Sequence, residues 1–254
     1  MMIVGEGLVF LLILGAGAYY IVRSLKRELR IAKLQRNFLM AVSHELRSPI
    51  ATMKLYLQTL QKRDLKEEKK NEILIDVLAN TDRLADLTDN IMTALRIEDR
   101  SLDLHLAPIE IAQLTKETIH VFQKTTAKEY KVEMDLNERA MAKVDPEAFK
   151  SILINLFENS VKYSPIGSTI TVRLAMNGTE TKLTVEDQGS GISPDEQKLI
   201  FDRFYRSGNE ETRKAAGTGL GLYIVKALCK AMNGRIELAS SLGNGSTFVA
   251  IFQK

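Results

Sequence analysis

Apolar residues fill the first part of the chain, and basic residues follow them at once. Residues 7–22 contain no charge, and Glu6 is the one charged residue before them. About 20 apolar residues span a bilayer, and the basic residues that flank such a helix stay on its cytoplasmic side. The pattern predicts a single transmembrane anchor at 1–22 in the inner membrane and a basic juxtamembrane helix at 23–36. A secretory signal peptide would carry its basic residues before the apolar run, and a buried core helix would not adjoin such a cluster.

Two helices with narrow apolar stripes are predicted next, over residues 37–100. Apolar residues recur at helical spacing up to Leu60, and a heptad pattern follows over residues 74–95, with the charged segment 61–70 as the turn. This pattern predicts an antiparallel helical hairpin. One hairpin cannot bury both stripes, so we expect a homodimer with an all-α four-helix bundle. A bundle formed with the rest of the chain is the alternative.

His44 and Pro49 are the unusual residues of the first helix. At about 100° per residue, His44 falls opposite the apolar stripe, on the solvated face. Pro49 removes the amide that would bond the carbonyl of Glu45, so we expect a kink or a bulge one turn after the histidine.

After Arg100 the pattern changes to one of alternating strands and helices, which predicts an α/β sandwich with one mixed sheet over 101–254. Asp145-Pro146 is a typical helix start, with Asp as the cap and Pro in the first turn. The predicted strands are 102–108, 130–136, 170–176, 182–186, 235–239 and 247–252, and the predicted helices are 110–127, 145–163, 194–200 and 220–232.

Composition and charge exclude several classes of protein. Hydrophobic residues make up 45% of the 254 residues and charged residues 26%, which excludes a mostly disordered chain. The net charge of +3 comes from residues 23–37, which hold six Lys or Arg and one Glu, so nucleic-acid binding is not indicated. The single cysteine, Cys229, excludes a disulfide framework and is expected to be a buried apolar residue.

Three polar side chains share one face of the predicted helix at 145–163. Asn155, Asn159 and Lys162 are spaced by four and three residues. Two carboxamide oxygens suit a hard cation, and a nearby lysine can neutralise phosphate. Exposed or capping asparagines are the alternative, although Asn is unfavourable inside helices.

Two glycine-rich segments suit the approach of a ligand to the backbone. Asp187-x-Gly-x-Gly191 follows a predicted strand, and its carboxylate can accept a hydrogen bond from an amine such as that of adenine. Gly217-x-Gly-x-Gly221 opens a helix, where free amides bind phosphate. Between them, Phe201 and Phe204 precede the polar segment 207–216, a candidate lid.

The order and spacing of these motifs, together with His44-Glu-Leu-Arg-Ser-Pro49, resemble those of sensor histidine kinases of two-component systems. The resemblance covers residues from about 30 to 254. It implies a dimerisation and phosphotransfer hairpin followed by an ATP-binding domain of the Bergerat type, which is shared with DNA gyrase and MutL.

The resemblance also implies a role for each residue. His44 would attack the γ-phosphate of ATP, and Glu45 would orient or deprotonate it. Asn155 and Asn159 would hold Mg²⁺. The phosphoryl group would pass to an aspartate of a response regulator, and Ser48 stands where members with phosphatase activity usually carry Thr or Asn. The implied nucleotide contacts are Asn155, Asn159, Lys162, Tyr163, Asp187, Gly189, Gly191, Phe204, Gly217, Thr218, Gly219, Leu220, Gly221 and Thr247.

Two other classes of function compete with this hypothesis. One is an ATPase of the same fold with another task, which the His44 hairpin disfavours. The other is a dimeric membrane scaffold without catalysis, which the complete set of Asn155, Asn159, Asp187 and loop glycines disfavours.

Overall fold

The computed structural model describes residues 2–63, 65–206 and 217–254, and for residues 2–10 and 124–125 it describes the backbone alone. The segment expected to form a lid, 207–216, lies outside the described residues.

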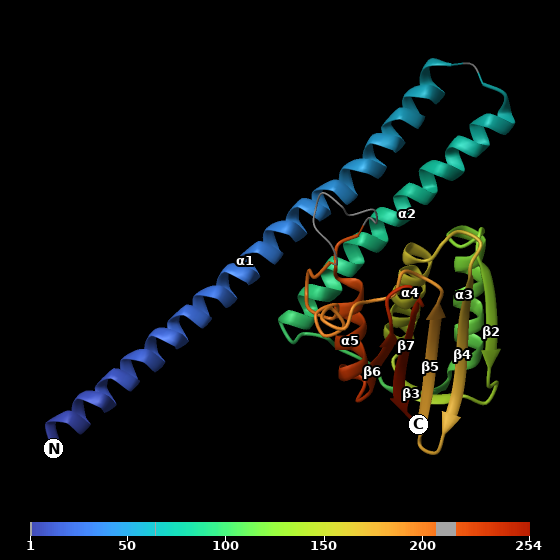
Figure 1. Cartoon of the computed structure of the whole chain (residues 1–254). Helices are drawn as coiled ribbons and strands as arrows, with labels where there is room; N and C mark the ends of the chain where they lie inside the picture. Colours follow the sequence, from blue (N-terminus) through green and yellow to red (C-terminus); the bar gives the residue numbers. More distant parts are fainter. Residues whose placement is uncertain (1, 64, 207–216) are drawn as a thin grey trace.

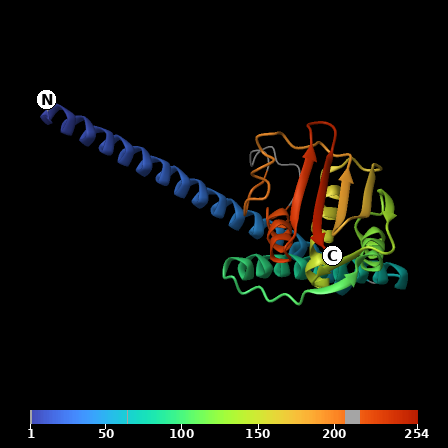
Figure 2. The same cartoon turned by 90° about the horizontal axis from the view of Figure 1, so that it is seen from below.

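A long helical hairpin forms the N-terminal part of the chain. Helix α1 (Met2–Lys62) runs without a break through Pro49, and α2 (Glu67–Glu98) returns beside it, which confirms the hairpin. The N-terminal half of α1 projects away from all other elements (Figure 1, Figure 2). Both helices keep exposed apolar side chains, because each can bury only one narrow stripe against the other; these include Leu39, Met40, Leu55, Leu57, Leu74, Ile75 and Leu78.

In the part of the chain whose side chains are described, no helix is both long and apolar enough to cross a membrane. Residues 1–10 of the expected anchor have no described side chains.

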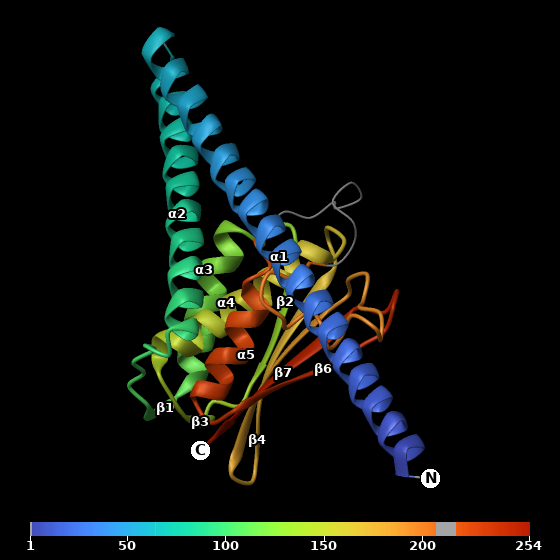
Figure 3. The same ribbon diagram turned by 90° about the vertical axis from the view of Figure 1, so that its left-hand side faces the viewer.

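The C-terminal part is an α/β sandwich, as predicted. Its five-stranded sheet has the order β2-β4-β5-β7-β6, in which β2 and β4 are parallel and the other neighbours are antiparallel. Figure 3 shows α3, α4 and α5 between α2 and the sheet. The elements are α3 (Ile111–Thr125), β2 (Lys131–Leu136), α4 (Pro146–Tyr163), β4 (Thr169–Asn177), β5 (Glu180–Asp187), α5 (Gly221–Ala231), β6 (Arg235–Ser240) and β7 (Ser246–Gln253).

The strand predicted from Leu102 to Pro108 is confirmed only at its end. Residues 102–106 form no strand, and pairing begins at β1 (Ala107–Glu110), which joins β3 (Met141–Val144) in a separate two-stranded sheet. The alternating leucines of 102–106 are half-buried against the core. Alternating apolar and polar residues therefore indicate that one side of the segment is buried. They do not show that a neighbouring strand is available to pair with it.

The helix predicted at 194–200 is wrong, since this segment is a series of turns. The amide of Glu196 bonds the carbonyl of Ser193, three residues back, whereas the amide of Ile200 bonds Glu196, four residues back. Mixed three- and four-residue bonds prevent a regular α-helix from forming.

Helix α4 is the centre of the core. Asp145 caps it by accepting a hydrogen bond from the Ala148 amide at 2.9 Å, with Pro146 in the first turn, as the sequence predicts. Phe157 on this helix is 1% exposed and meets Phe122 of α3 edge to face at 5.3 Å. Cys229 on α5 is buried, as expected, and burial raises its thiol pKa to about 12.

Phe157→Ala is expected to lower the free energy of unfolding by about 3–5 kcal/mol, because it empties a ring-sized volume in the core. Ile166→Ala, at a side chain that is 72% exposed, is the matched control and should change stability by less than about 0.5 kcal/mol. Urea unfolding followed by tyrosine fluorescence measures both variants. A cost below about 1 kcal/mol for Phe157→Ala would contradict this description of the core.

Candidate active site

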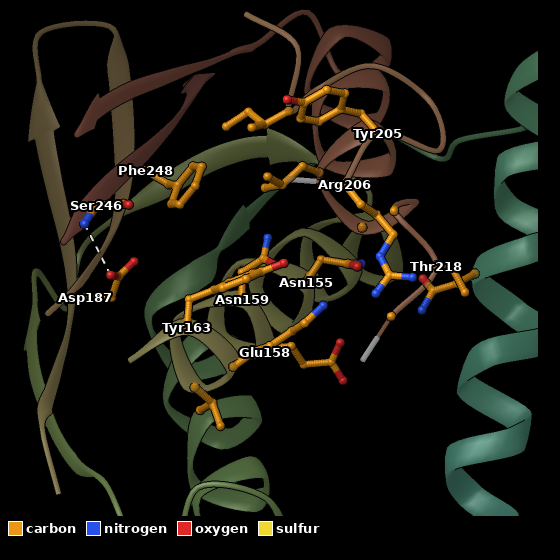
Figure 4. Close-up of a pocket in the computed structure, with 18 of the residues that line it drawn as sticks. Asn155, Glu158, Asn159, Tyr163, Asp187, Tyr205, Arg206, Thr218, Ser246 and Phe248 are labelled. Carbon is orange, nitrogen blue, oxygen red and sulfur yellow. Dashed lines mark hydrogen bonds between the residues drawn. The ribbon is translucent and has the colours of Figure 1, made fainter. Parts of the chain in front are cut away.

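A cavity of about 490 Å³ lies between the α/β sandwich and the hairpin. This volume falls within the range of small-molecule sites in proteins. Its walls come from α4, from the segments after β5 and before α5, and from β7 (Figure 4). Both helices of the hairpin also contribute side chains.

Asn155 and Asn159 lie on the α4 side of the cavity, with Lys162 on the same helix. The amide nitrogen of Asn155 donates to the Ser151 carbonyl at 2.9 Å, which orients its oxygen toward the start of α5. A side chain at Gly221 would place its Cβ 2.6 Å from that oxygen, so glycine is required there. The two carboxamide oxygens fit the oxygen ligands that Mg²⁺ prefers.

Asp187 lies at the opposite wall, at the end of β5, and is buried. Its Oδ1 atom accepts from the Gly189 amide at 2.8 Å. The same oxygen accepts from the Ser246 amide at 3.2 Å (Figure 4). Both bonds go to one oxygen, so Oδ2 is left for a ligand amine. Burial raises the pKa of this carboxyl, and the two amide bonds offset part of the rise.

The glycine loop before α5 brings its backbone close to positive charge. Gly217 has φ of +137°, and a Cβ on it would come within 2.5 Å of the Lys162 ammonium. Gly219 has φ of +73°, and its carbonyl accepts from the Phe204 amide at 3.1 Å. Amides and an ammonium that converge in this way form an anion site.

The described structure brings most of the expected nucleotide contacts together around this cavity. The lining includes Asn155, Asn159, Lys162, Tyr163, Asp187, Gly191, Gly217, Thr218, Gly219 and Gly221, and also Glu45.

Four expected contacts lie beside the cavity and do not line it. Gly189 holds Asp187 through its amide, Leu220 is buried in the core, and Phe204 stacks on Phe38 of α1 at 4.0 Å. Thr247 is replaced in the lining by its neighbours Ser246 and Phe248. Successive residues of a strand point to opposite faces, so a shift of one position moves a side chain to the other side of the sheet.

His44 and Ser48 are exposed on α1. His44 does not line the cavity. It lies instead in a shallow groove on α1 that also includes Met40, Ser43 and Arg47. The prediction that His44 occupies the solvated face of the helix is confirmed.

Several lining residues were not expected from the sequence. Ser246 and Phe248 could have been found from the alternation of β7. Tyr205 bonds Glu196 at 3.0 Å, and burial followed by that bond raises its pKa to about 12. A further group is contributed by α2 and has no sequence signal: Arg83, Asp86, Leu87 and Asn90.

Glu158 of α4 faces this α2 group. Its pKa is raised mainly by burial and then by the Asp86 carboxylate, while Lys162 and Arg83 lower it. Burial also raises the pKa of the Asp86 carboxyl. The hairpin thus places acidic and basic side chains directly against the cavity.

Comparison with known proteins identifies both parts of the chain. Residues 34–100 match the family described as "His Kinase A (phospho-acceptor) domain", and residues 144–254 match "Histidine kinase-, DNA gyrase B-, and HSP90-like ATPase". The two matches, in this order, show that the chain belongs to the sensor histidine kinase family of two-component systems.

Individual relatives agree with this assignment. Sensor protein SrrB of Staphylococcus aureus (strain NCTC 8325 / PS 47) is 29% identical over 237 residues, which are 92% of this chain and 40% of that protein. The chain therefore spans less than half the length of the curated relatives it matches. Full-length ShkA, solved in complex with AMPPNP, is 25% identical with a TM-score of 0.59, over 84% of this chain and 45% of that one. The histidine kinase ThkA in complex with the response regulator protein TrrA is 22% identical with a TM-score of 0.56, over 84% of this chain and 60% of that one, and shows the same fold.

Asp187→Asn is expected to weaken nucleotide binding while it increases the stability of the folded chain. Asn can keep both amide bonds through Oδ1 but presents an NH₂ group in place of Oδ2, so affinity for AMPPNP should fall by roughly tenfold or more in calorimetry. Folding raises the pKa of the Asp187 carboxyl, so its ionised form lowers the free energy of unfolding at pH 7. Asp187→Asn removes this charge. The variant should therefore unfold at a higher urea concentration than the native chain at pH 7. The stability gap should narrow as the pH falls through the native pKa.

Asp135→Asn, at an exposed position of β2, is the matched control for both measurements and should match the native chain. A less stable Asp187→Asn protein at pH 7, or unchanged nucleotide affinity, would contradict the geometry described for Asp187.

Proposed function

We propose that the chain is a membrane-anchored protein histidine kinase that phosphorylates His44 from Mg-ATP and passes the phosphoryl group to an aspartate of a response regulator. The observation that carries the proposal is the cavity, in which a free carboxylate oxygen of Asp187, the Asn155 amide oxygen and the Gly217 loop converge. The same chain carries a solvent-exposed His44 on the adjoining hairpin.

In the proposed reaction, an imidazole nitrogen of His44 attacks the γ-phosphorus of ATP. A nitrogen–phosphorus bond forms as the bond to the bridging oxygen breaks, and ADP leaves. Glu45 orients the imidazole and takes up its proton. Asp187 accepts a hydrogen bond from the adenine amine, with Gly189 and Ser246 holding the carboxylate in place.

The remaining nucleotide contacts fall into two groups. Lys162 and Tyr163 flank the nucleotide from α4, and Gly191 shapes the segment after Asp187. The phosphates lie against the loop that runs from Gly217 to Gly221.

Asn155 and Asn159 would hold Mg²⁺ through their carboxamide oxygens. The buried Asn155 oxygen, which is oriented by the bond of its amide nitrogen to Ser151, fits a hard cation. When bound, the ion would neutralise charge on the phosphates.

Autophosphorylation in this arrangement needs either a rearrangement or a second copy of the chain. His44 lies in a groove outside the cavity of its own chain. The exposed apolar side chains of α1 and α2 support a homodimer with a four-helix bundle. Either the ATP-binding domain moves along its own hairpin, or it reaches His44 of the partner subunit.

The response regulator is proposed as the second substrate. ThkA, which shares the fold, was solved in complex with the response regulator TrrA. An exposed His44 leaves room for such a partner on the hairpin. Ser48, exposed one turn further along α1, would position water for phosphatase activity.

The membrane part of the proposal rests on α1. Its apolar side chains between Leu11 and Val22 are exposed and make no packing contact with the core. The continuous helix from there to His44 provides a mechanical connection between a membrane segment and the phosphorylation site.

The decisive variant for the kinase activity is His44→Gln. The native chain in mild detergent, incubated with Mg²⁺ and γ-labelled ATP, should acquire a label that is lost in acid and kept in base, and His44→Gln should acquire none. His120→Gln, at an exposed histidine of α3, is the matched control and should label normally. Label that persists in His44→Gln would favour another ATPase or kinase of this fold. Absence of label with AMPPNP still bound would favour the non-catalytic scaffold.

The membrane anchor has its own test. Leu12→Arg combined with Leu14→Arg should move the chain out of the carbonate-resistant membrane fraction, because each central arginine costs about 2.5–3.5 kcal/mol of insertion free energy. Leu242→Arg, at an exposed position between β6 and β7, should stay in that fraction. A native chain found in the soluble fraction would contradict the anchor.

A further inference from the structure

The Glu45 carboxylate reaches from the hairpin into the cavity of the α/β sandwich. Its side chain is 11% exposed, although His44 beside it faces solvent. Oε1 accepts a hydrogen bond from the Gly217 amide at 2.7 Å, and Oε2 accepts one from the guanidinium of Arg83 on α2 at 2.9 Å. Both carboxylate oxygens are therefore engaged, and Glu45 is turned toward the glycine loop.

The position that Glu45 occupies is suited to a phosphate. The Gly217 amide and the nearby Lys162 ammonium belong to the anion site described above. A carboxylate and a phosphate oxygen accept the same kind of charge-assisted hydrogen bond from an amide. One N–H group cannot donate fully to both, so the two anions compete for Gly217.

Other contacts hold the hairpin and the sandwich in this arrangement. Phe38 of α1 stacks on Phe204, and Arg30 of α1 lies 3.7 Å from Asp202. Arg203 forms an ion pair with Glu98 at the end of α2. The placement of Glu45 is thus part of a wider interface and does not depend on one side-chain rotamer.

We propose that Glu45 is a built-in competitor for the phosphate-binding amide of Gly217, with Arg83 as the positioning residue that holds it there. Nucleotide phosphate displaces Glu45 from the loop, and only then is the carboxylate available to His44. This inference rests on the proposed function, since it concerns the same nucleotide site.

The arrangement couples two events that would otherwise be independent. Without nucleotide, the carboxylate that serves His44 is held away from it. Phosphate at Gly217 both fills the site and releases that carboxylate. The affinity for nucleotide is lowered as a result, because the phosphate must replace the contact between Glu45 and Gly217.

Isothermal titration of the whole chain with AMPPNP and Mg²⁺ tests the competition without any chemical step. Glu45→Ala should bind AMPPNP about tenfold more tightly than the native chain, the effect expected when a competing charge-assisted hydrogen bond is removed. Glu45→Gln keeps a neutral acceptor and should show a smaller gain. Adenosine, which has no phosphate, should bind all three proteins equally.

Asp86→Asn is the matched control, because Asp86 also lines the cavity but makes no bond to Gly217. Measured at pH 8, it should improve AMPPNP affinity by less than about twofold. An equal gain in Asp86→Asn and Glu45→Gln would reduce the effect to general charge repulsion and overturn the proposal. Unchanged AMPPNP affinity in Glu45→Ala, or an equal gain for adenosine, would overturn it as well.

The role of Arg83 has a separate readout. If Arg83 acts by holding Glu45, Arg83→Gln should give part of the gain in AMPPNP affinity, and it should add nothing in a Glu45→Ala background. Arg83→Lys should restore the native affinity in large part. Additive effects in the double variant would remove Arg83 from the proposal.

The kinase function and the competition at Gly217 are tested by different measurements. Labelled phosphohistidine in the native chain without any change of affinity in Glu45→Ala would leave the kinase function standing and overturn the competition. A gain in affinity in Glu45→Ala without labelling of the native chain would support the competition and contradict the kinase function.

Discussion

The packing of α4 against the sheet is the contact on which the rest of the structure depends. One face of this helix buries Phe149, Ile152, Leu156 and Phe157 in the core. The adjoining stripe presents Asn155, Asn159 and Lys162 to the cavity. Because the buried side chains hold the helix at a defined distance and rotation, they also determine where the polar stripe lies. The packing of the core therefore also fixes the geometry of the site in this domain.

A second constraint is close approach of the backbone at the cavity. Gly221 leaves room for the Asn155 oxygen, and Gly217 leaves room for Lys162. Asp187 depends on the same kind of proximity, because two backbone amides must reach one of its oxygens. The site is built from main-chain groups as much as from side chains. Such groups move little unless their elements move, which suits a site that must bind a charged ligand repeatedly.

The fold could be predicted wherever local signals were strong. The cap at Asp145 and the periodicity of α1 and α2 are local signals, and both predictions are confirmed. Prediction failed where tertiary contacts decide. The leucines of 102–106 pack on the core without a strand partner, and the segment 194–200 alternates between two hydrogen-bond spacings.

The sequence by itself determined the two domains, their order and the exposure of His44, because helical periodicity and the spacing of motifs are local properties. It also determined which residue types reach the cavity from α4 and from the glycine loop. Only the tertiary structure decided that Glu45 turns into that cavity while His44 turns away, and that α2 contributes Arg83 to it. The contact between Glu45 and Gly217 joins residues 172 positions apart. This contact depends on how the hairpin packs against the α/β sandwich, and no local sequence pattern predicts that packing.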